Sequence, residues 1–148
     1  MNSNSSQIML LSIRPRYVER ILAGDKTVEL RRTKPLVDVG QPIAIYSTLP
    51  AGAIVATARV ARVEQRAKQE LWEARRRTLG VSKDEFNSYF AGRSHAVGVH
   101  LDLVAPLEAP VSLSQMRVLG VPNPPQQWMF LRSSDWGRRL NLAEPAAA

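Results

Sequence analysis

Three charged side chains lie close together within the stretch Gly24–Arg32: Lys26, Glu29 and Arg31. Side chains two positions apart on a strand share one face of a sheet, so a strand here would set Glu29 beside Arg31, with Lys26 at its start. Such a group could hold a phosphate or carbonyl oxygen, accept a hydrogen bond from a base, or use Glu29 as a general base. The alternating valine and leucine would face the core, so we expect the charged face to look toward water or a ligand.

Four other residues could line the same site. Arg14 follows an apolar run and precedes a helix, where an anion would relieve the repulsion between a cation and the positive helix end. Tyr46 and Ser47 end another apolar run, so Tyr46 could stack on a base and Ser47 could bond an oxygen. Gln126 lies in a proline-rich segment and could contact the edge of a base. The alternatives are core packing for Tyr46, an exposed arginine at position 14, and a surface ion pair at Lys26 and Glu29 worth about 0–1 kcal/mol.

Two other charged groups carry less chemistry. The run Arg75–Arg77 would spread over roughly 200° of a helix, which favours a solvated face over a row of phosphate contacts. His95 and His100 are too few, and lack carboxylates at the right spacing, for a metal site. We therefore predict neither a metal nor a cofactor, and leave His95 as an alternative acid or base.

The Lys26 stretch needs a helix before it and a sheet around it. Pro15 can open a helix, Gly24 can end it, and the apolar pattern between them indicates one buried face. Strands are predicted at 8–13, 27–32, 42–47, 53–64, 94–107 and 128–131, and helices at 15–23, 65–79, 82–92, 112–119 and 133–140. This order predicts an α+β fold, a small mixed β-barrel of five to six strands with peripheral helices. We expect one domain over 8–140, with flexible tails at 1–7 and 141–148.

Composition narrows the class of protein. The 148 residues include 20 Lys and Arg against 13 Asp and Glu, a net charge of +7, which favours a polyanionic partner. The absence of cysteine excludes disulfides, thiol nucleophiles and zinc–thiolate sites. No apolar run approaches the ~20 residues of a membrane helix, and the first residues do not form a secretory signal. We expect a cytoplasmic protein without a membrane partner, and leave its oligomeric state open.

Two early blocks of sequence, 11–17 and 21–31, resemble the opening of ASCH domains, which belong to the PUA-like superfamily. The signature of that family is a glycine, a lysine, a glutamate and an arginine at the spacing of Gly24, Lys26, Glu29 and Arg31. Short blocks at 89–92, 110–113 and 124–126 are similar to later landmarks of one subgroup. The resemblance extends over about residues 8–131.

The resemblance implies a small β-barrel with a cleft beside the signature helix and strand. It also implies binding of RNA or nucleotides, and some members of the family are hydrolases. One branch removes the acetyl group of N4-acetylcytidine with a lysine, a threonine and a glutamate, and another branch is a ribonuclease. Lys26 matches the lysine of the amidohydrolase branch, but Glu29 stands where that branch has its threonine.

Three hypotheses remain. The leading hypothesis is a domain that binds RNA or a modified nucleoside in a cleft centred on Lys26, Glu29 and Arg31. The first alternative is a metal-independent hydrolase, either a ribonuclease or a nucleoside amidohydrolase, that uses Lys26 and Glu29 as catalytic residues in the same cleft. The second alternative is a regulatory protein whose basic face binds DNA or another protein.

Overall fold

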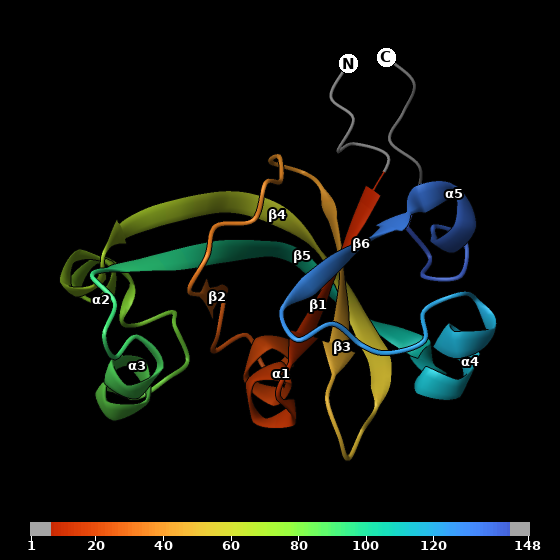
Figure 1. Ribbon diagram of the computed structural model, residues 1–148, viewed down its shortest axis with the longest axis horizontal. Helices are drawn as coiled ribbons and strands as arrows, with labels where there is room; N and C mark the ends of the chain where they lie inside the picture. The colour runs from red at the N-terminus through yellow and green to blue at the C-terminus, as the bar shows by residue number, and fades with distance from the viewer. Residues whose placement is uncertain (1–6, 143–148) are drawn as a thin grey trace.

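The computed structural model describes residues 7–142, and these residues form a mixed α+β fold with six strands and five helices (Figure 1). The strands are β1 (Gln7–Ile13), β2 (Val28–Arg31), β3 (Pro42–Ser47), β4 (Ala53–Ala67), β5 (His95–Ser112) and β6 (Trp128–Arg132). The helices are α1 (Pro15–Leu22), α2 (Lys68–Arg75), α3 (Lys83–Tyr89), α4 (Leu113–Val118) and α5 (Ser133–Trp136).

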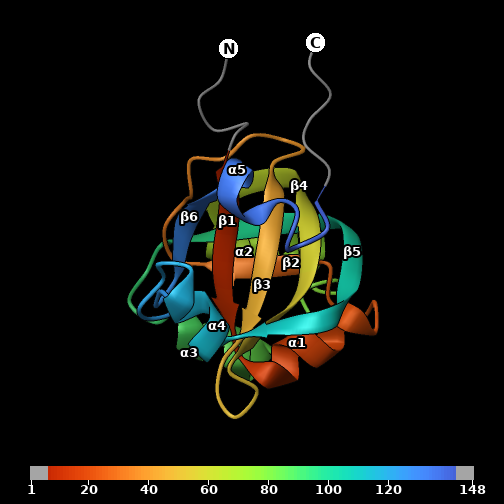
Figure 2. The same cartoon turned by 90° about the vertical axis from the view of Figure 1, so that its right-hand side faces the viewer.

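All six strands belong to one sheet, in the order β2-β5-β4-β3-β1-β6. Every pair is antiparallel except β1 and β3, which run parallel. The sheet curves strongly (Figure 2), but within residues 7–142 no backbone ladder joins its edge strands, β2 and β6. The structure therefore has the predicted number of strands and an open sheet, where the sequence predicted a barrel.

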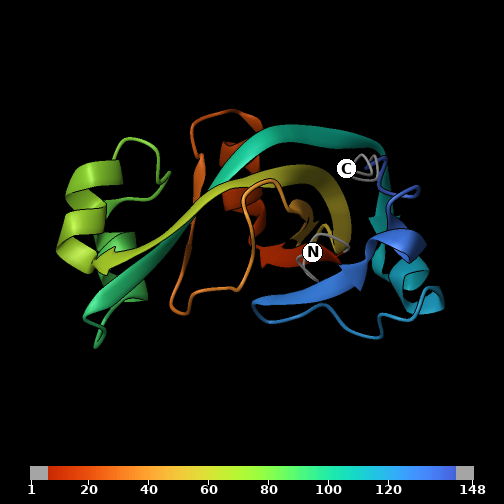
Figure 3. The ribbon, with the colours of Figure 1, turned by 90° about the horizontal axis from the view of Figure 1, so that it is seen from above.

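Strands β4 and β5 form a long curved ribbon that runs from α2 and α3 at one end to α4 at the other (Figures 1 and 3). Three register shifts between the two strands accompany the curve. Both strands are longer than predicted. Gln65, Arg66 and Ala67 pair with β5, so the helix predicted over 65–79 begins only at Lys68. Residues 65–67 extend β4 instead of the helix; no side chain caps the start of α2, so nothing local favours an earlier helix start.

Local sequence signals mark the starts of α1 and α3. Pro15 opens α1, and Ser82 caps α3 in a capping box with Glu85, as predicted. At the ends of the described chain, Gln7 belongs to β1 and Leu142 packs against the core. Most of the two segments predicted to be flexible, 1–7 and 141–148, lies outside the described residues.

Strand β2 is short and is buried over its whole length. Val28 and Leu30 pack in an apolar cluster with Leu71 of α2 and Phe86 of α3. Glu29 and Arg31 alternate with them and are buried as well. An edge strand such as β2 can be buried on both faces only if helices and loops cover it. The segments that cover β2 also form walls of the site.

Candidate functional site

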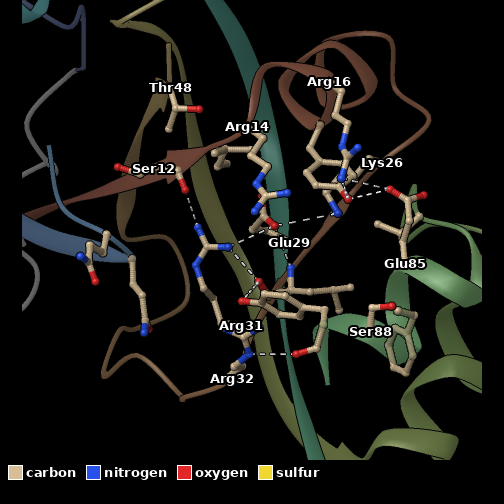
Figure 4. Close-up of a pocket in the computed structure, with 18 of the residues that line it drawn as sticks. Ser12, Arg14, Arg16, Lys26, Glu29, Arg31, Arg32, Thr48, Glu85 and Ser88 are labelled. Carbon is tan, nitrogen blue, oxygen red and sulfur yellow. Dashed lines mark hydrogen bonds and ion pairs between the residues drawn. The ribbon is translucent and has the colours of Figure 1, made fainter. Parts of the chain in front are cut away.

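A pocket of about 820 Å³ lies where the sheet is open. One wall is the edge strand β2, and the facing wall is the segment that leads into β6. Thr33 Oγ1, just after β2, donates to Gln127 Oε1 of the facing wall at 3.1 Å, and Arg31 Nη2 of β2 donates to the carbonyl of Ser12 in β1 at 3.0 Å. The end of β1, helix α1 and helix α3 complete the lining (Figure 4). The lining residues are Ser12–Arg14, Arg16, Tyr17, Lys26, Glu29–Arg32, Thr48, Val81, Asp84–Phe86, Ser88, Tyr89 and Pro125–Gln127.

Lys26, Glu29 and Arg31 form one ion-pair cluster at this pocket (Figure 4). Glu29 Oε1 lies 3.2 Å from Arg31 Nη1 and 3.9 Å from Lys26 Nζ. The three residues are only 1%, 4% and 6% exposed. The structure thus brings the three residues together as predicted, but it corrects the expectation of an open charged face, since the cluster is buried below the pocket surface.

The turn after α2 holds Lys26 in place. Lys26 Nζ donates to the carbonyl of Leu79 at 2.6 Å. Gly80 adopts φ +64°, and a Cβ there would lie 2.5 Å from the Lys26 Cβ, so only glycine permits this approach. Burial lowers the pKa of Lys26; Glu29 opposes that effect, and the nearby Arg31 adds to it.

Two atoms of the cluster have no hydrogen-bond partner within residues 7–142: Glu29 Oε2 and Arg31 Nε, both buried. The other oxygen, Glu29 Oε1, accepts from the backbone N–H of Leu30 at 3.0 Å in addition to its ion pairs. The protein therefore engages only one of the two oxygens of the Glu29 carboxylate. Buried polar atoms nearly always have a partner, so the unpartnered acceptor and donor in this pocket leave two positions at which a ligand or a water molecule could form a hydrogen bond.

A second charged group joins the helices on either side of the pocket. Tyr17 of α1 donates its hydroxyl to Glu85 Oε2 of α3 at 2.7 Å, and Arg20 Nη1 lies 3.7 Å from Glu85 Oε1. The Ser82 backbone N–H and the Tyr17 hydroxyl hold the pKa of Glu85 at about 2. Burial and the hydrogen bond to Glu85 raise the pKa of Tyr17. Sequence reasoning identified Glu85 only as a capping residue; its place at the pocket depends on the contact with Tyr17, 68 positions away in the chain, which no local pattern indicates.

The remaining predicted site residues divide into two groups. Arg14 and Gln126 line the pocket and are exposed. Tyr46 and Ser47 are 2% and 3% exposed and do not line it; Tyr46 packs in a core cluster with Ile54. Within residues 7–142, no three histidine, aspartate or glutamate side chains gather closely enough to hold a metal ion.

Comparison with known proteins assigns the family. A family described as "Domain of unknown function (DUF365)" matches residues 9–121. A curated ASCH domain-containing ribonuclease from Zymomonas mobilis is 28% identical over 134 residues, which is 90% of each chain. A crystal structure of ASCH from the same organism superposes with a TM-score of 0.85 at 28% identity, over 91% of this chain and 94% of that one. The chain belongs to the family matched over residues 9–121, and it is an ASCH domain.

More distant structures share the fold alone. The N-terminal domain of Staphylothermus marinus McrB is 13% identical to this ASCH domain and superposes with a TM-score of 0.53, over 93% of this chain and 96% of that one. No described helix of the ASCH domain is both long and apolar enough to span a membrane.

Proposed function

We propose that this ASCH domain binds RNA in the pocket, with one nucleotide placed over Lys26, Glu29 and Arg31. The observation that carries the proposal is Glu29 Oε2, a buried acceptor beside two cations with no hydrogen-bond partner within residues 7–142. An unmade hydrogen bond of this kind costs about 1–3 kcal/mol or more for a charged group. A ligand N–H or O–H that reaches Glu29 recovers this energy.

The pocket offers a group for each part of a nucleotide. Its volume of about 820 Å³ suits a small polar ligand. Arg14 and Arg16 are exposed at the pocket, and arginine forks match phosphate oxygens. Glu29 accepts from a base or ribose, and Gln126 offers both a donor and an acceptor. The relative from Zymomonas mobilis, named a ribonuclease, supports RNA as the class of ligand.

The same relative favours a second function at this site, the cleavage of RNA. In the proposed step, Glu29 Oε2 takes the proton of a ribose 2′-hydroxyl, and the 2′-oxygen forms a bond to the adjacent phosphorus. The bond from phosphorus to the 5′-oxygen breaks, and Lys26 gives its proton to that oxygen. The products are a 2′,3′-cyclic phosphate and a 5′-hydroxyl. A proton passed from Glu29 to Lys26, which lie 3.9 Å apart, restores the site.

The lowered pKa of Lys26 suits this role. An ammonium group that burial makes more acidic gives up its proton more readily to a leaving oxygen. The guanidinium of Arg31 can hold the phosphate in the transition state. Each of the three cluster residues thus has a separate task in the proposed reaction.

Binding is tested with Glu29→Gln and Lys26→Met, which keep the approximate size of each side chain. Their controls are Glu73→Gln and Lys34→Met, because Glu73 and Lys34 are exposed and do not line the pocket. Titration with a fluorescent RNA of about four nucleotides, near the size of a short single-strand site, should show at least tenfold weaker binding for the pocket variants. Equal binding by pocket and control variants would refute the proposal.

Cleavage is tested with the same four proteins and a longer RNA, with products separated and their ends determined by mass spectrometry. The proposed step predicts cyclic phosphate ends that disappear with Glu29→Gln and Lys26→Met and persist in both controls. Binding without cleavage would leave the domain as an RNA binder. Release of acetate from N4-acetylcytidine, without RNA cleavage, would favour the amidohydrolase instead.

A further inference from the structure

A second buried glutamate, Glu64 of β4, gathers three positively charged or ionisable partners on the long ribbon. It is 7% exposed. Arg66 Nε donates to Glu64 Oε1 at 2.5 Å, and Arg75 Nε of α2 donates to Glu64 Oε2 at 3.0 Å. His100 of β5 also contacts Glu64 Oε2 through its Nε2. Burial alone would raise the pKa of Glu64, but the hydrogen bonds from His100, Arg75 and Arg66 outweigh it and hold that pKa at about 2.

The Glu64 cluster lies on the opposite face of the sheet from Glu29. Glu29 pairs with Val99, which in turn pairs with Val63. Glu64 pairs with Gly98, one residue away in both strands. Because paired residues share a face and neighbours alternate, Glu29 and Glu64 point to opposite sides. The cluster is therefore outside the pocket described above.

Each arginine around Glu64 approaches the carboxylate through its Nε only. Arg66 and Arg75 bind the carboxylate through Nε, and the nearest Arg62 nitrogen is also Nε, at 3.8 Å. Their side chains are 55% (Arg62), 33% (Arg66) and 26% (Arg75) exposed. Within the described part of the chain, no hydrogen bond engages their Nη nitrogens. Each guanidinium keeps its outer N–H groups for a further acceptor.

The local charge is positive. Three arginines against one glutamate leave a net charge of about +2, and the exposed Arg76 and Arg77 follow at the end of α2. The two exposed acids of α2, Glu70 and Glu73, do not face the cluster. On a helix that directs Leu71 and Arg75 to the sheet, Glu73 falls on the far side and Glu70 lies about 120° around the helix axis.

We propose that Arg62, Arg66 and Arg75 form a second RNA contact, a docking surface for the phosphate backbone beside α2 on the β4–β5 ribbon. The proposal rests on the proposed function, because it takes RNA as the partner. The guanidinium groups of Arg66 and Arg75 are anchored through Nε and so pre-organised, which means that they lose less side-chain freedom when they bind a phosphate. Arg62 adds a third, more exposed guanidinium beside them. The pocket holds one nucleotide, and the docking surface holds the backbone farther along the same RNA.

The experiment compares Arg62→Gln/Arg66→Gln with Arg138→Gln/Arg139→Gln. The control arginines are exposed and follow α5, at the other end of the molecule from α2 (Figures 1 and 3). Each variant is titrated with RNAs of about four and about 20 nucleotides over a range of KCl concentrations. The proposal predicts at least tenfold weaker binding of the longer RNA by the Arg62/Arg66 variant. It also predicts a salt dependence shallower by about 1.4, for two phosphate contacts. Binding of the short RNA should stay within twofold of the unmodified protein.

Several outcomes would overturn the proposal. A loss of binding no larger than in the Arg138/Arg139 control would mean that net charge alone acts. Equal loss with a DNA duplex of the same length, or with anionic lipid vesicles, would mean a general polyanion surface. If Arg62→Gln/Arg66→Gln lowers the melting temperature, Arg62→Gln alone replaces it, since the Arg62 side chain only approaches Glu64 at 3.8 Å and donates no hydrogen bond within residues 7–142. The expected change in salt dependence is then about 0.7, for one phosphate contact.

The pocket variant Glu29→Gln separates this proposal from the proposed function. If Glu29→Gln weakens the short RNA while Arg62→Gln/Arg66→Gln weakens only the long one, both proposals hold. If only the arginine variant acts, the docking surface holds and the RNA pocket fails. If only Glu29→Gln acts, the pocket holds and the docking surface is wrong.

Discussion

The molecule holds two buried glutamates on opposite faces of one sheet, and they differ in how completely the protein uses them. Around Glu64 both carboxylate oxygens receive short hydrogen bonds from side chains. Around Glu29 one oxygen receives the backbone and the ion pairs, while the other has no hydrogen-bond partner within residues 7–142. The protein itself satisfies the Glu64 carboxylate, whereas at Glu29 it leaves one buried acceptor, which is the atom that the proposed ligand would engage.

This difference separates stability from function within the same residue type. A satisfied buried ion cluster fixes elements to each other, and removing its centre leaves several charges without a partner. An unsatisfied cluster stores a cost that binding can recover. The fold can carry such a cost at β2 because α2, α3 and the turn between them hold the strand independently of Glu29.

The largest expected effect comes from Gly80, which contacts Lys26 in the Glu29 cluster. A methyl group at Gly80 would collide with Lys26 in a backbone conformation that favours glycine, so Gly80→Ala should lower the free energy of unfolding by about 4 kcal/mol. Urea denaturation measures this loss. At Gly98, beside Glu64, the nearest contact would be 3.0 Å from Val28, and Gly98→Ala should cost about 1 kcal/mol.

A further control separates the collision from the backbone effect. Gly92 has φ +77°, but a Cβ added there would meet nothing within 4 Å, so Gly92→Ala should cost about 1–2 kcal/mol. Equal losses for Gly80→Ala and Gly92→Ala would show that Lys26 does not need the close approach of Gly80.

The second prediction concerns the Glu64 cluster. Glu64→Gln should lower the free energy of unfolding by about 3 kcal/mol at pH 7, because the pKa of Glu64 falls from 4.5 to about 2 in the fold. A depressed carboxyl pKa stabilises above the unfolded value, and that stability is lost as the pH falls toward the folded value. The difference between variant and unmodified protein should therefore shrink by about half at pH 3.

Urea denaturation at both pH values measures the effect, with Glu73→Gln as an exposed control. A difference that does not depend on pH would mean that Glu64 acts by packing and not by charge. Binding of the short RNA should be unchanged in Glu64→Gln, because Glu64 faces away from the pocket.

The third prediction concerns Lys26 in the Glu29 cluster, where a substitution should stabilise the protein instead of destabilising it. Lys26→Met should raise the free energy of unfolding by about 1 kcal/mol at pH 7, because burial disfavours the charged amine. A lysine with a lowered folded pKa makes the unmodified protein more stable as the pH rises toward 10.5. The gain from Lys26→Met should therefore decrease from pH 7 to pH 10, as thermal or urea unfolding can show. A variant less stable at both pH values would mean that the ion pair with Glu29 outweighs burial.

The smallest expected effect is the coupling across the pocket walls. Tyr17→Phe removes the hydrogen bond between α1 and α3, and Glu85→Gln removes the charge of its acceptor. A double-mutant cycle should give a coupling energy of about 0.5–1 kcal/mol, because the Glu85 side chain is 27% exposed and water screens the interaction. A coupling energy of zero, measured by urea denaturation, would mean that the two helices are fixed by packing alone.

Sequence reasoning located the Glu29 cluster but missed the Glu64 cluster. The spacing of Lys26, Glu29 and Arg31 on a strand predicted their meeting, since strand periodicity is a local property. Glu64 meets Arg75 and His100 only because α2 returns to the ribbon and β5 pairs with β4. The sequence shows these residues 11 and 36 positions from Glu64, and no local pattern relates them.

The amino-acid sequence by itself determined most elements near their observed ends, the capping of α3 by Ser82, and the membership of Lys26, Glu29 and Arg31 in one group. These features depend on periodicity, caps and turn residues that act over a few positions. Tertiary structure alone decided that the sheet stays open, that the charged face of β2 is buried, and that Tyr46 lies in the core. Those outcomes depend on which segments cover a strand, and burial is set by neighbours that are distant in the chain.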